Sequence, residues 1–115
     1  MKILISTLAA ASMSAAVAAW TAPSPSYEYV VRIDKNFNPD RIEVKIGDTV
    51  IWKNFDSGDH TVTAELRPAS PQEGGFDSGV ILSGLSYEKV FSRIGTYKYY
   101  CKLHPEEMGT VIVTR

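Results

Sequence analysis

Few residues in this chain are suited to metal chemistry, because it contains one cysteine, Cys101, and two histidines, His60 and His104. His104 follows Cys101 after two intervening residues, whereas His60 lies far upstream. One thiolate and two imidazoles form a nearly trigonal donor set, which with a weak axial thioether is the arrangement of electron-transfer copper sites. Thiolate sulfur favours Cu(I), and imidazole suits both oxidation states. The residue types and their spacing therefore predict a site for one copper ion.

Each of these residues also has a simpler explanation when it is taken alone. A loop histidine such as His60 is usually a surface residue, and a single cysteine at a strand end is usually a small buried hydrophobe. Together they favour a metal site, because the N-terminal segment described below predicts export, and an exported protein would otherwise carry a free thiol. Haem attachment needs two cysteines, and a catalytic zinc site needs a general base that we do not identify in the sequence. We therefore expect a copper protein that is not an enzyme.

The elements that would position these side chains are short β-strands separated by turns. Apolar residues alternate cleanly at Ile42, Val44 and Ile46, which predicts that these three side chains share one face. No window after the first 20 residues has a sustained helical period. We expect strands at 27–33, 41–46, 49–54, 61–63, 87–91, 96–101 and 110–114, a turn at 36–39, an irregular stretch at 66–79 and a loop from 101 to 108. This pattern predicts a single all-β domain, either a sandwich or a barrel.

The N-terminal segment has the features of a secretory signal. Lys2 is followed by an uncharged stretch, residues 3–19, which ends in small residues of the kind that signal peptidase accepts. We predict a signal peptide over 1–19, a flexible leader over 20–26 and the folded domain over 27–115, in a periplasmic or secreted protein without a stable membrane span. The chain has 12 Lys and Arg against 13 Asp and Glu, so nucleic acid is not an expected partner.

Three motifs along the predicted domain are similar to those of cupredoxins, the small blue-copper family of plastocyanin, pseudoazurin and amicyanin. They are Phe37-x-Pro39 continuing through Gly47-Asp48 to Asn54, Asp59-His60-Thr61-Val62, and Gly95-x-Tyr97-x-Tyr99-x-Cys101-x-x-His104-Pro105. The resemblance implies a Greek-key β-sandwich that holds one copper ion near one end. It also implies that His60, Cys101 and His104 are the equatorial ligands, and that the backbone N–H of Thr61 donates to the cysteine sulfur.

The fourth ligand is where this chain departs from the resemblance. Family members with short loops have Met three residues after the second histidine, but here Glu107 occupies that position and Met108 follows it. If the last strand extends back to this point, Glu107 shares the face of Val111 and Val113, and Met108 lies on the opposite face. A buried carboxylate is costly unless a metal or hydrogen bonds satisfy it, and thioether is the usual axial group of the family. Glu107 and Met108 are both candidates.

The resemblance implies a small, soluble, monomeric electron carrier that cycles between Cu(I) and Cu(II). Its expected partner is a redox protein such as a c-type cytochrome or a copper- or quinone-containing enzyme, with electrons passing through the exposed edge of His104. An axial Glu107 would favour Cu(II), because a carboxylate oxygen is a hard, anionic ligand. Two alternatives follow from that possibility: a copper-binding carrier without redox shuttling, and a copper protein that binds a small ligand at an open coordination position.

Overall fold

The computed structural model describes residues 24–65 and 75–115, so the predicted signal peptide over 1–19 lies outside the described residues. All the regular elements of the described part are β-strands, as expected. They are β1 (Glu28–Ile33), β2 (Phe37–Asn38), β3 (Arg41–Lys45), β4 (Thr49–Asn54), β5 (Thr63–Ala64), β6 (Phe76–Asp77), β7 (Ser86–Val90), β8 (Gly95–Cys101) and β9 (His104–Thr114). No helix that could span a membrane occurs among the described residues.

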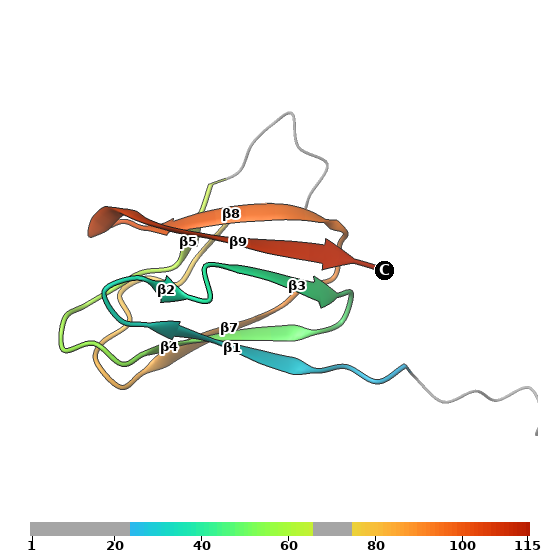
Figure 1. Ribbon diagram of the computed structural model, residues 1–115, viewed down its shortest axis with the longest axis horizontal. Helices are drawn as coiled ribbons and strands as arrows, with labels where there is room; N and C mark the ends of the chain where they lie inside the picture. Colours follow the sequence, from blue (N-terminus) through green and yellow to red (C-terminus); the bar gives the residue numbers. More distant parts are fainter. Residues whose placement is uncertain (1–23, 66–74) are drawn as a thin grey trace, which may run out of the picture.

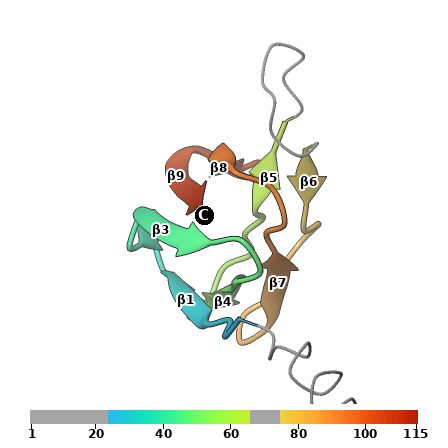
Figure 2. The same cartoon turned by 90° about the vertical axis from the view of Figure 1, so that its right-hand side faces the viewer.

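The strands form two sheets that face each other as a β-sandwich (Figure 1). One sheet has the order β2-β1-β4-β7, and the other has the order β3-β9-β8-β5-β6. Each sheet is mixed, because β1 runs parallel to β4 and β3 runs parallel to β9, while the other pairs are antiparallel. Figure 2 looks toward one end of this arrangement and separates the two layers. The fold class predicted from the sequence is therefore confirmed.

The core lies between the sheets and is rich in aromatic rings. Trp52 of β4 is fully buried and has its ring centroid 5.3 Å from that of Tyr99 and 5.8 Å from that of Tyr87. Inward positions alternate with outward ones along the strands, as the pleat requires. The buried apolar residues are Val31, Ile33, Phe37, Val44, Val50, Trp52, Val62, Ala64, Ile81, Phe91, Tyr97, Tyr99, Cys101, Val111 and Val113.

The segment from Cys101 to Met108 is not the loop that the sequence predicts, because β9 already begins at His104. Only two residues separate β8 from β9, and the two strands form an antiparallel hairpin. Pro105 is tolerated inside β9 because β3 pairs with this strand only from Thr110 onward, which leaves one edge of its first half open. The strand therefore carries Glu107 and Met108 on opposite faces.

Other differences from the expected strands are small. Ile46 does not share the buried face of Val44, because β3 ends at Lys45 and Ile46 is exposed in the following turn. Phe37 and Asn38 form a short strand in place of the expected turn. The strand expected at 61–63 is instead Thr63–Ala64.

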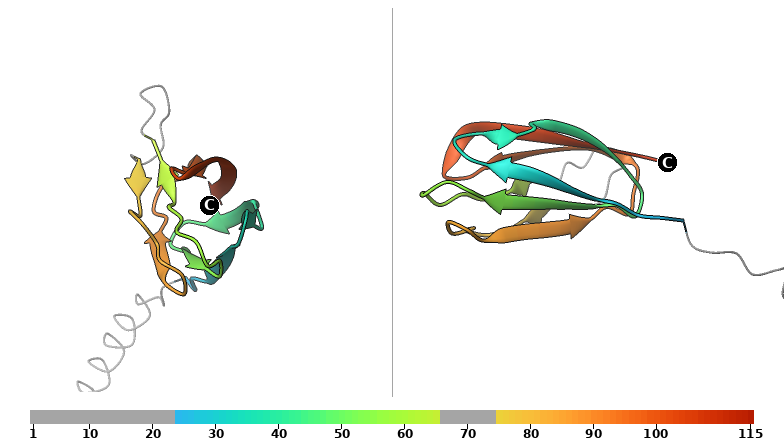
Figure 3. Two further views of the ribbon diagram at one scale, coloured as in Figure 1. Left: turned by 90° about the vertical axis from the view of Figure 1, so that its left-hand side faces the viewer. Right: turned by 60° about the horizontal axis from the view of Figure 1, so that its bottom comes forward.

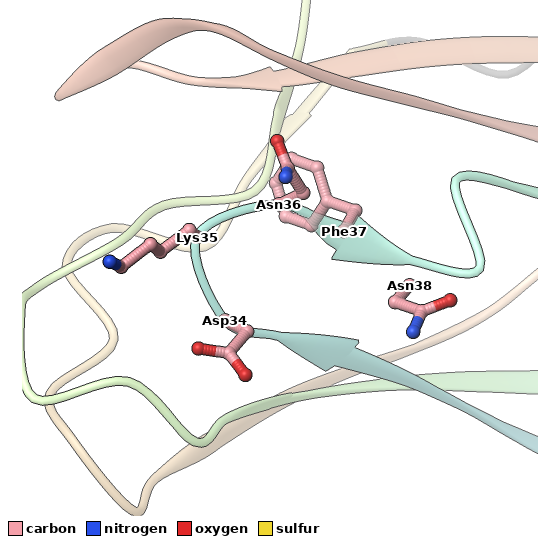
Figure 4. Close-up of a pocket in the computed structure, with 5 residues that line it drawn as sticks. All are labelled: Asp34, Lys35, Asn36, Phe37 and Asn38. Carbon is pink, nitrogen blue, oxygen red and sulfur yellow. The ribbon is translucent and has the colours of Figure 1, made fainter.

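A hollow of about 420 Å³ lies beside the connection between β1 and β2 (Figure 4). It is lined by five consecutive residues, Asp34, Lys35, Asn36, Phe37 and Asn38. None of the histidine, cysteine or glutamate residues considered as ligands is among them, so this hollow does not belong to the predicted metal site.

Truncating Trp52 tests the importance of the aromatic core. Because its side chain is fully buried between the sheets, Trp52→Ala should lower the free energy of unfolding by about 3–5 kcal/mol. Tyr27→Ala is the matched control, since that ring is exposed and its loss should change the value by less than about 0.5 kcal/mol. Chemical denaturation measures both; equal, small losses for the two variants would contradict this description of the core.

Candidate metal centre

Four potential metal ligands converge at one end of the sandwich. His60 lies between β4 and β5, Cys101 ends β8, and His104 and Glu107 belong to β9. Their ligand atoms all lie within 4.8 Å of one another. The β8–β9 turn that carries two of these residues lies at the end of the molecule opposite the C-terminus (Figures 1 and 3).

Three of the four distances between donor atoms are near those around a four-coordinate ion, and the fourth, between Glu107 and His60, is of hydrogen-bond length. Cys101 Sγ lies 3.9 Å from His60 Nδ1 and 3.6 Å from His104 Nδ1. Glu107 Oε1 lies 2.9 Å from His60 Nδ1 and 3.8 Å from His104 Nδ1. Donors bound at about 2.0–2.3 Å around a four-coordinate ion lie roughly 3.3–3.8 Å apart. One soft sulfur, two imidazoles and one carboxylate fit copper, because imidazole and thiolate are the ligands that copper sites use.

The β8–β9 hairpin places Cys101 and His104 together. Cys101 pairs directly with His104, and the register shifts at the step from Tyr100 to Cys101. Because only two residues form the turn, Cys101 and His104 lie opposite each other at the paired ends of β8 and β9. The imidazole of His104 is 43% exposed, whereas Cys101 is fully buried.

The next residues of β9 direct Glu107 inward and Met108 outward. Glu107 is 5% exposed and Met108 is 65% exposed. Gly109 faces the Tyr99 ring so closely that a Cβ atom there would lie 2.3 Å from Tyr99 Cζ. Burial also raises the pKa of Tyr99 to about 12. The structure thus brings Glu107 to the two histidines and the cysteine, and it does not bring Met108 there.

His60 is held from both sides of its ring and through its backbone. Its side chain is 1% exposed, and its Nε2 lies 2.8 Å from Asp56 Oδ2. The His60 carbonyl accepts a 2.7 Å bond from the N–H of Ile81, and the hydrogen bond with His60 lowers the pKa of Asp56. Asn54 shapes this loop by accepting from the Asp56 N–H and donating to the Ile81 carbonyl. The ring is therefore fixed with Nδ1 directed toward Cys101.

Asp56 is a residue to which the sequence alone assigns no role. Its spacing of four residues before His60 was visible, but nothing in the sequence showed that the loop would turn the carboxylate toward the imidazole. When Nδ1 of a histidine binds a metal, Nε2 carries the proton and donates it to a carboxylate or carbonyl. Asp56 can therefore fix both the tautomer and the orientation of His60.

Thr61 joins the His60 segment to the hairpin. Its N–H donates to Cys101 Sγ over 3.3 Å, which is the hydrogen bond that the cupredoxin resemblance implies. Its hydroxyl oxygen accepts from the N–H of Lys102 over 2.8 Å. Thr61 thus contacts the cysteine sulfur and the residue that follows it.

Known proteins similar to this chain are copper proteins. The family described as copper binding proteins, plastocyanin/azurin family, matches residues 28–114. Amicyanin-alpha of Methylorubrum extorquens is 33% identical over 113 residues, which cover 92% of each chain. The solved structure of a reduced amicyanin variant has a TM-score of 0.68 at 31% identity, and the match covers 76% of this chain and 82% of the amicyanin chain. A purple cupredoxin from Nitrosopumilus maritimus has a TM-score of 0.64 at 28% identity, with coverage of 75% and 99%.

Removing the Asp56 carboxylate should weaken metal binding at the centre. Partners that orient a ligating histidine typically contribute about 10–100-fold to metal affinity, so Asp56→Ala should raise the dissociation constant for Cu(II) by that factor. Competition with a chelator of known affinity measures it. Asp59→Ala is the control, because Asp59 is exposed and adjacent to His60; equal affinities for the two variants would show that Asp56 does not orient the ring.

Proposed function

The chain belongs to the plastocyanin/azurin family of copper-binding proteins, and we propose that it is a small electron carrier. We propose four residues as the ligands of its single copper ion: His60, Cys101, His104 and Glu107. The observation that carries this proposal is the convergence of their four ligand atoms within 4.8 Å at one end of the sandwich. Bound copper supplies the one-electron Cu(I)/Cu(II) couple.

The protein contributes a rigid donor set and one exposed edge. The hairpin pairing fixes Cys101 against His104. Asp56 holds the imidazole of His60, and the Thr61 N–H donates to Cys101 Sγ. Fixed donors change little between oxidation states, which keeps the rearrangement that accompanies electron transfer small. Because His104 is the exposed member of the set, its imidazole edge is the route by which electrons enter and leave.

Glu107 distinguishes this centre from one with an axial thioether. A carboxylate oxygen is harder than thioether sulfur and carries a negative charge, so it stabilises Cu(II) more than Cu(I). A lower reduction potential follows from this preference. The position of Glu107 supports its role as a ligand, because its buried carboxylate is directed at the proposed site, with Oε1 2.9 Å from His60 Nδ1.

The partner we propose is a redox protein, such as a c-type cytochrome or a copper- or quinone-containing enzyme, that docks over His104. Leu103 and Pro105 flank this histidine and are exposed, and so is Glu106. An acidic residue at the rim favours a basic partner, because complementary charge steers encounter. The signal-like sequence of residues 1–19 supports export, so we propose a periplasmic or secreted monomer without catalytic activity of its own.

A second candidate function is copper binding without electron shuttling, and the hard oxygen of Glu107 is the feature that favours it. Such a carrier would hold Cu(II) tightly and exchange electrons slowly. A reversible potential together with rapid self-exchange would exclude this alternative, whereas tight copper binding with slow self-exchange would support it over the electron carrier.

Electron transfer to a basic c-type cytochrome tests the carrier function and its docking surface together. The Cu(I)-loaded protein should reduce the oxidised cytochrome rapidly and become Cu(II) in the same one-electron step, and the bimolecular rate should fall as ionic strength rises. Stopped-flow absorbance at several salt concentrations measures this. A rate that does not change with salt would contradict the acidic docking surface, and the absence of transfer would contradict the carrier function.

Exchanging the proposed fourth ligand should raise the reduction potential. Glu107→Met replaces a hard anionic donor by a soft neutral one; each tenfold change in the ratio of Cu(I) to Cu(II) affinity shifts the potential by about 59 mV. We expect an increase of at least that size, measured by cyclic voltammetry. Met108→Leu is the matched control, because Met108 is exposed, and its potential should equal that of the parent. A shift confined to Met108→Leu would assign the ligand to the thioether instead.

A further inference from the structure

We propose that an ion pair at the protein surface, between Lys102 and Asp77, positions the Cys101 sulfur by acting through two buried hydroxyl groups. These hydroxyls belong to Thr61 and Thr63. The inference deepens the proposed function, because it rests on Cys101 being a copper ligand. It assigns positioning roles to Thr61 in the loop before β5 and to residues of β5, β6 and the β8–β9 turn, none of which is itself a potential ligand.

The four residues form a closed ring of polar contacts. The ammonium of Lys102 pairs with Asp77 Oδ2, and the Thr63 hydroxyl donates to Asp77 Oδ1 over 3.1 Å. The hydroxyl oxygens of Thr63 and Thr61 are 3.1 Å apart, and the N–H of Lys102 donates to Thr61 Oγ1 over 2.8 Å. The ring thus begins at the side chain of Lys102 and returns to its backbone.

The ring is joined to the sulfur at two points. Lys102 follows Cys101 directly, so fixing its backbone N–H restrains the peptide next to the cysteine. Thr61 donates its own N–H to Cys101 Sγ over 3.3 Å. Hydrogen bonding around a cysteine sulfur tunes the potential and the electronic structure of a copper site. A displacement of Thr61 would therefore change the hydrogen bond to the Cys101 sulfur.

The ring leads from the surface to the interior. Thr61 and Thr63 are 3% and 4% exposed, so a lost hydroxyl partner is costly to replace. The side chains of Lys102 and Asp77 are 50% and 40% exposed. The N–H of Gly79 also donates to Asp77 Oδ1 over 3.0 Å, which anchors the carboxylate to the backbone beyond β6. A charged group at the surface is in this way connected to the hydrogen bond on the sulfur.

The ion pair between Lys102 and Asp77 orients neighbouring groups more than it stabilises the fold. Ion pairs between exposed side chains usually contribute little to the free energy of unfolding. The Lys102 ammonium lowers the pKa of Asp77, and the charged carboxylate accepts the hydrogen bond from the Thr63 hydroxyl. Breaking the pair should therefore change the surroundings of the sulfur more than it changes the stability of the fold.

Amide hydrogen exchange of the metal-free protein tests the ring without copper. Asp77→Ala should speed exchange at the N–H groups of Thr61 and Lys102 by about three- to tenfold, the range expected for one weakened hydrogen bond. Glu65→Ala is the matched control: Glu65 is an exposed carboxylate that accepts from the Tyr100 hydroxyl and lies outside the ring. Unchanged exchange in Asp77→Ala, or an equal change in Glu65→Ala, would overturn the proposal.

The thiolate-to-Cu(II) absorption band provides a second, spectroscopic readout. Asp77→Ala and Lys102→Met should shift the band in the same direction, and Thr61→Val should shift it further because it removes the hydroxyl that joins the ring. Thr61→Ser keeps that hydroxyl and should restore the parent band. A band that coincides with the parent in Asp77→Ala would overturn the proposal. A parent without any thiolate band would instead refute copper ligation by Cys101, while the exchange rates would still report on the ring.

Discussion

The register of the β8–β9 hairpin is the constraint on which the centre depends. It places Tyr99 opposite Gly109 and Tyr100 opposite Met108, and after a register shift it pairs Cys101 with His104 across a two-residue turn. Glu107 lies within this irregularity and is buried, whereas Met108 is exposed. A slip of one residue would exchange the two faces of the strand, which would bring Met108 inward and turn Glu107 out. Gly109 favours the observed register, because the Tyr99 ring occupies the space that any larger side chain would need. Core packing and ligand selection are thus consequences of the same pairing.

The position of His60 in the centre is fixed by polar contacts, because this residue belongs to a loop and no extended β-ladder holds it. Asn54 and Ile81 hold its backbone segment, and Asp56 orients its imidazole from the side away from the cysteine. Thr61 then links the His60 loop to the hairpin, because its N–H donates to Cys101 Sγ. The sandwich supplies the frame, and these contacts convert it into a site with little freedom to rearrange, which is what a one-electron carrier requires.

The sequence was sufficient for the fold class and for the identity of three candidate ligands, because alternation and residue type are local properties. It did not locate the start of β9, because the run of β-forming residues resumes only at Thr110, and only the sheet order shows that Pro105 lies on an open edge. The choice between Glu107 and Met108 depended on that same boundary. Asp77 was not recognised because it lies 25 residues from Lys102, and only the folded sheet brings the two together.

The central claim is that the hairpin register makes a buried carboxylate the fourth copper ligand. The visible absorption and EPR spectra of the Cu(II)-loaded protein test it most directly. A strong oxygen ligand predicts a dominant thiolate band at shorter wavelength and a wide copper hyperfine splitting. An intense band in the red with a narrow splitting would mean a weak axial ligand, and would contradict the assignment of Glu107.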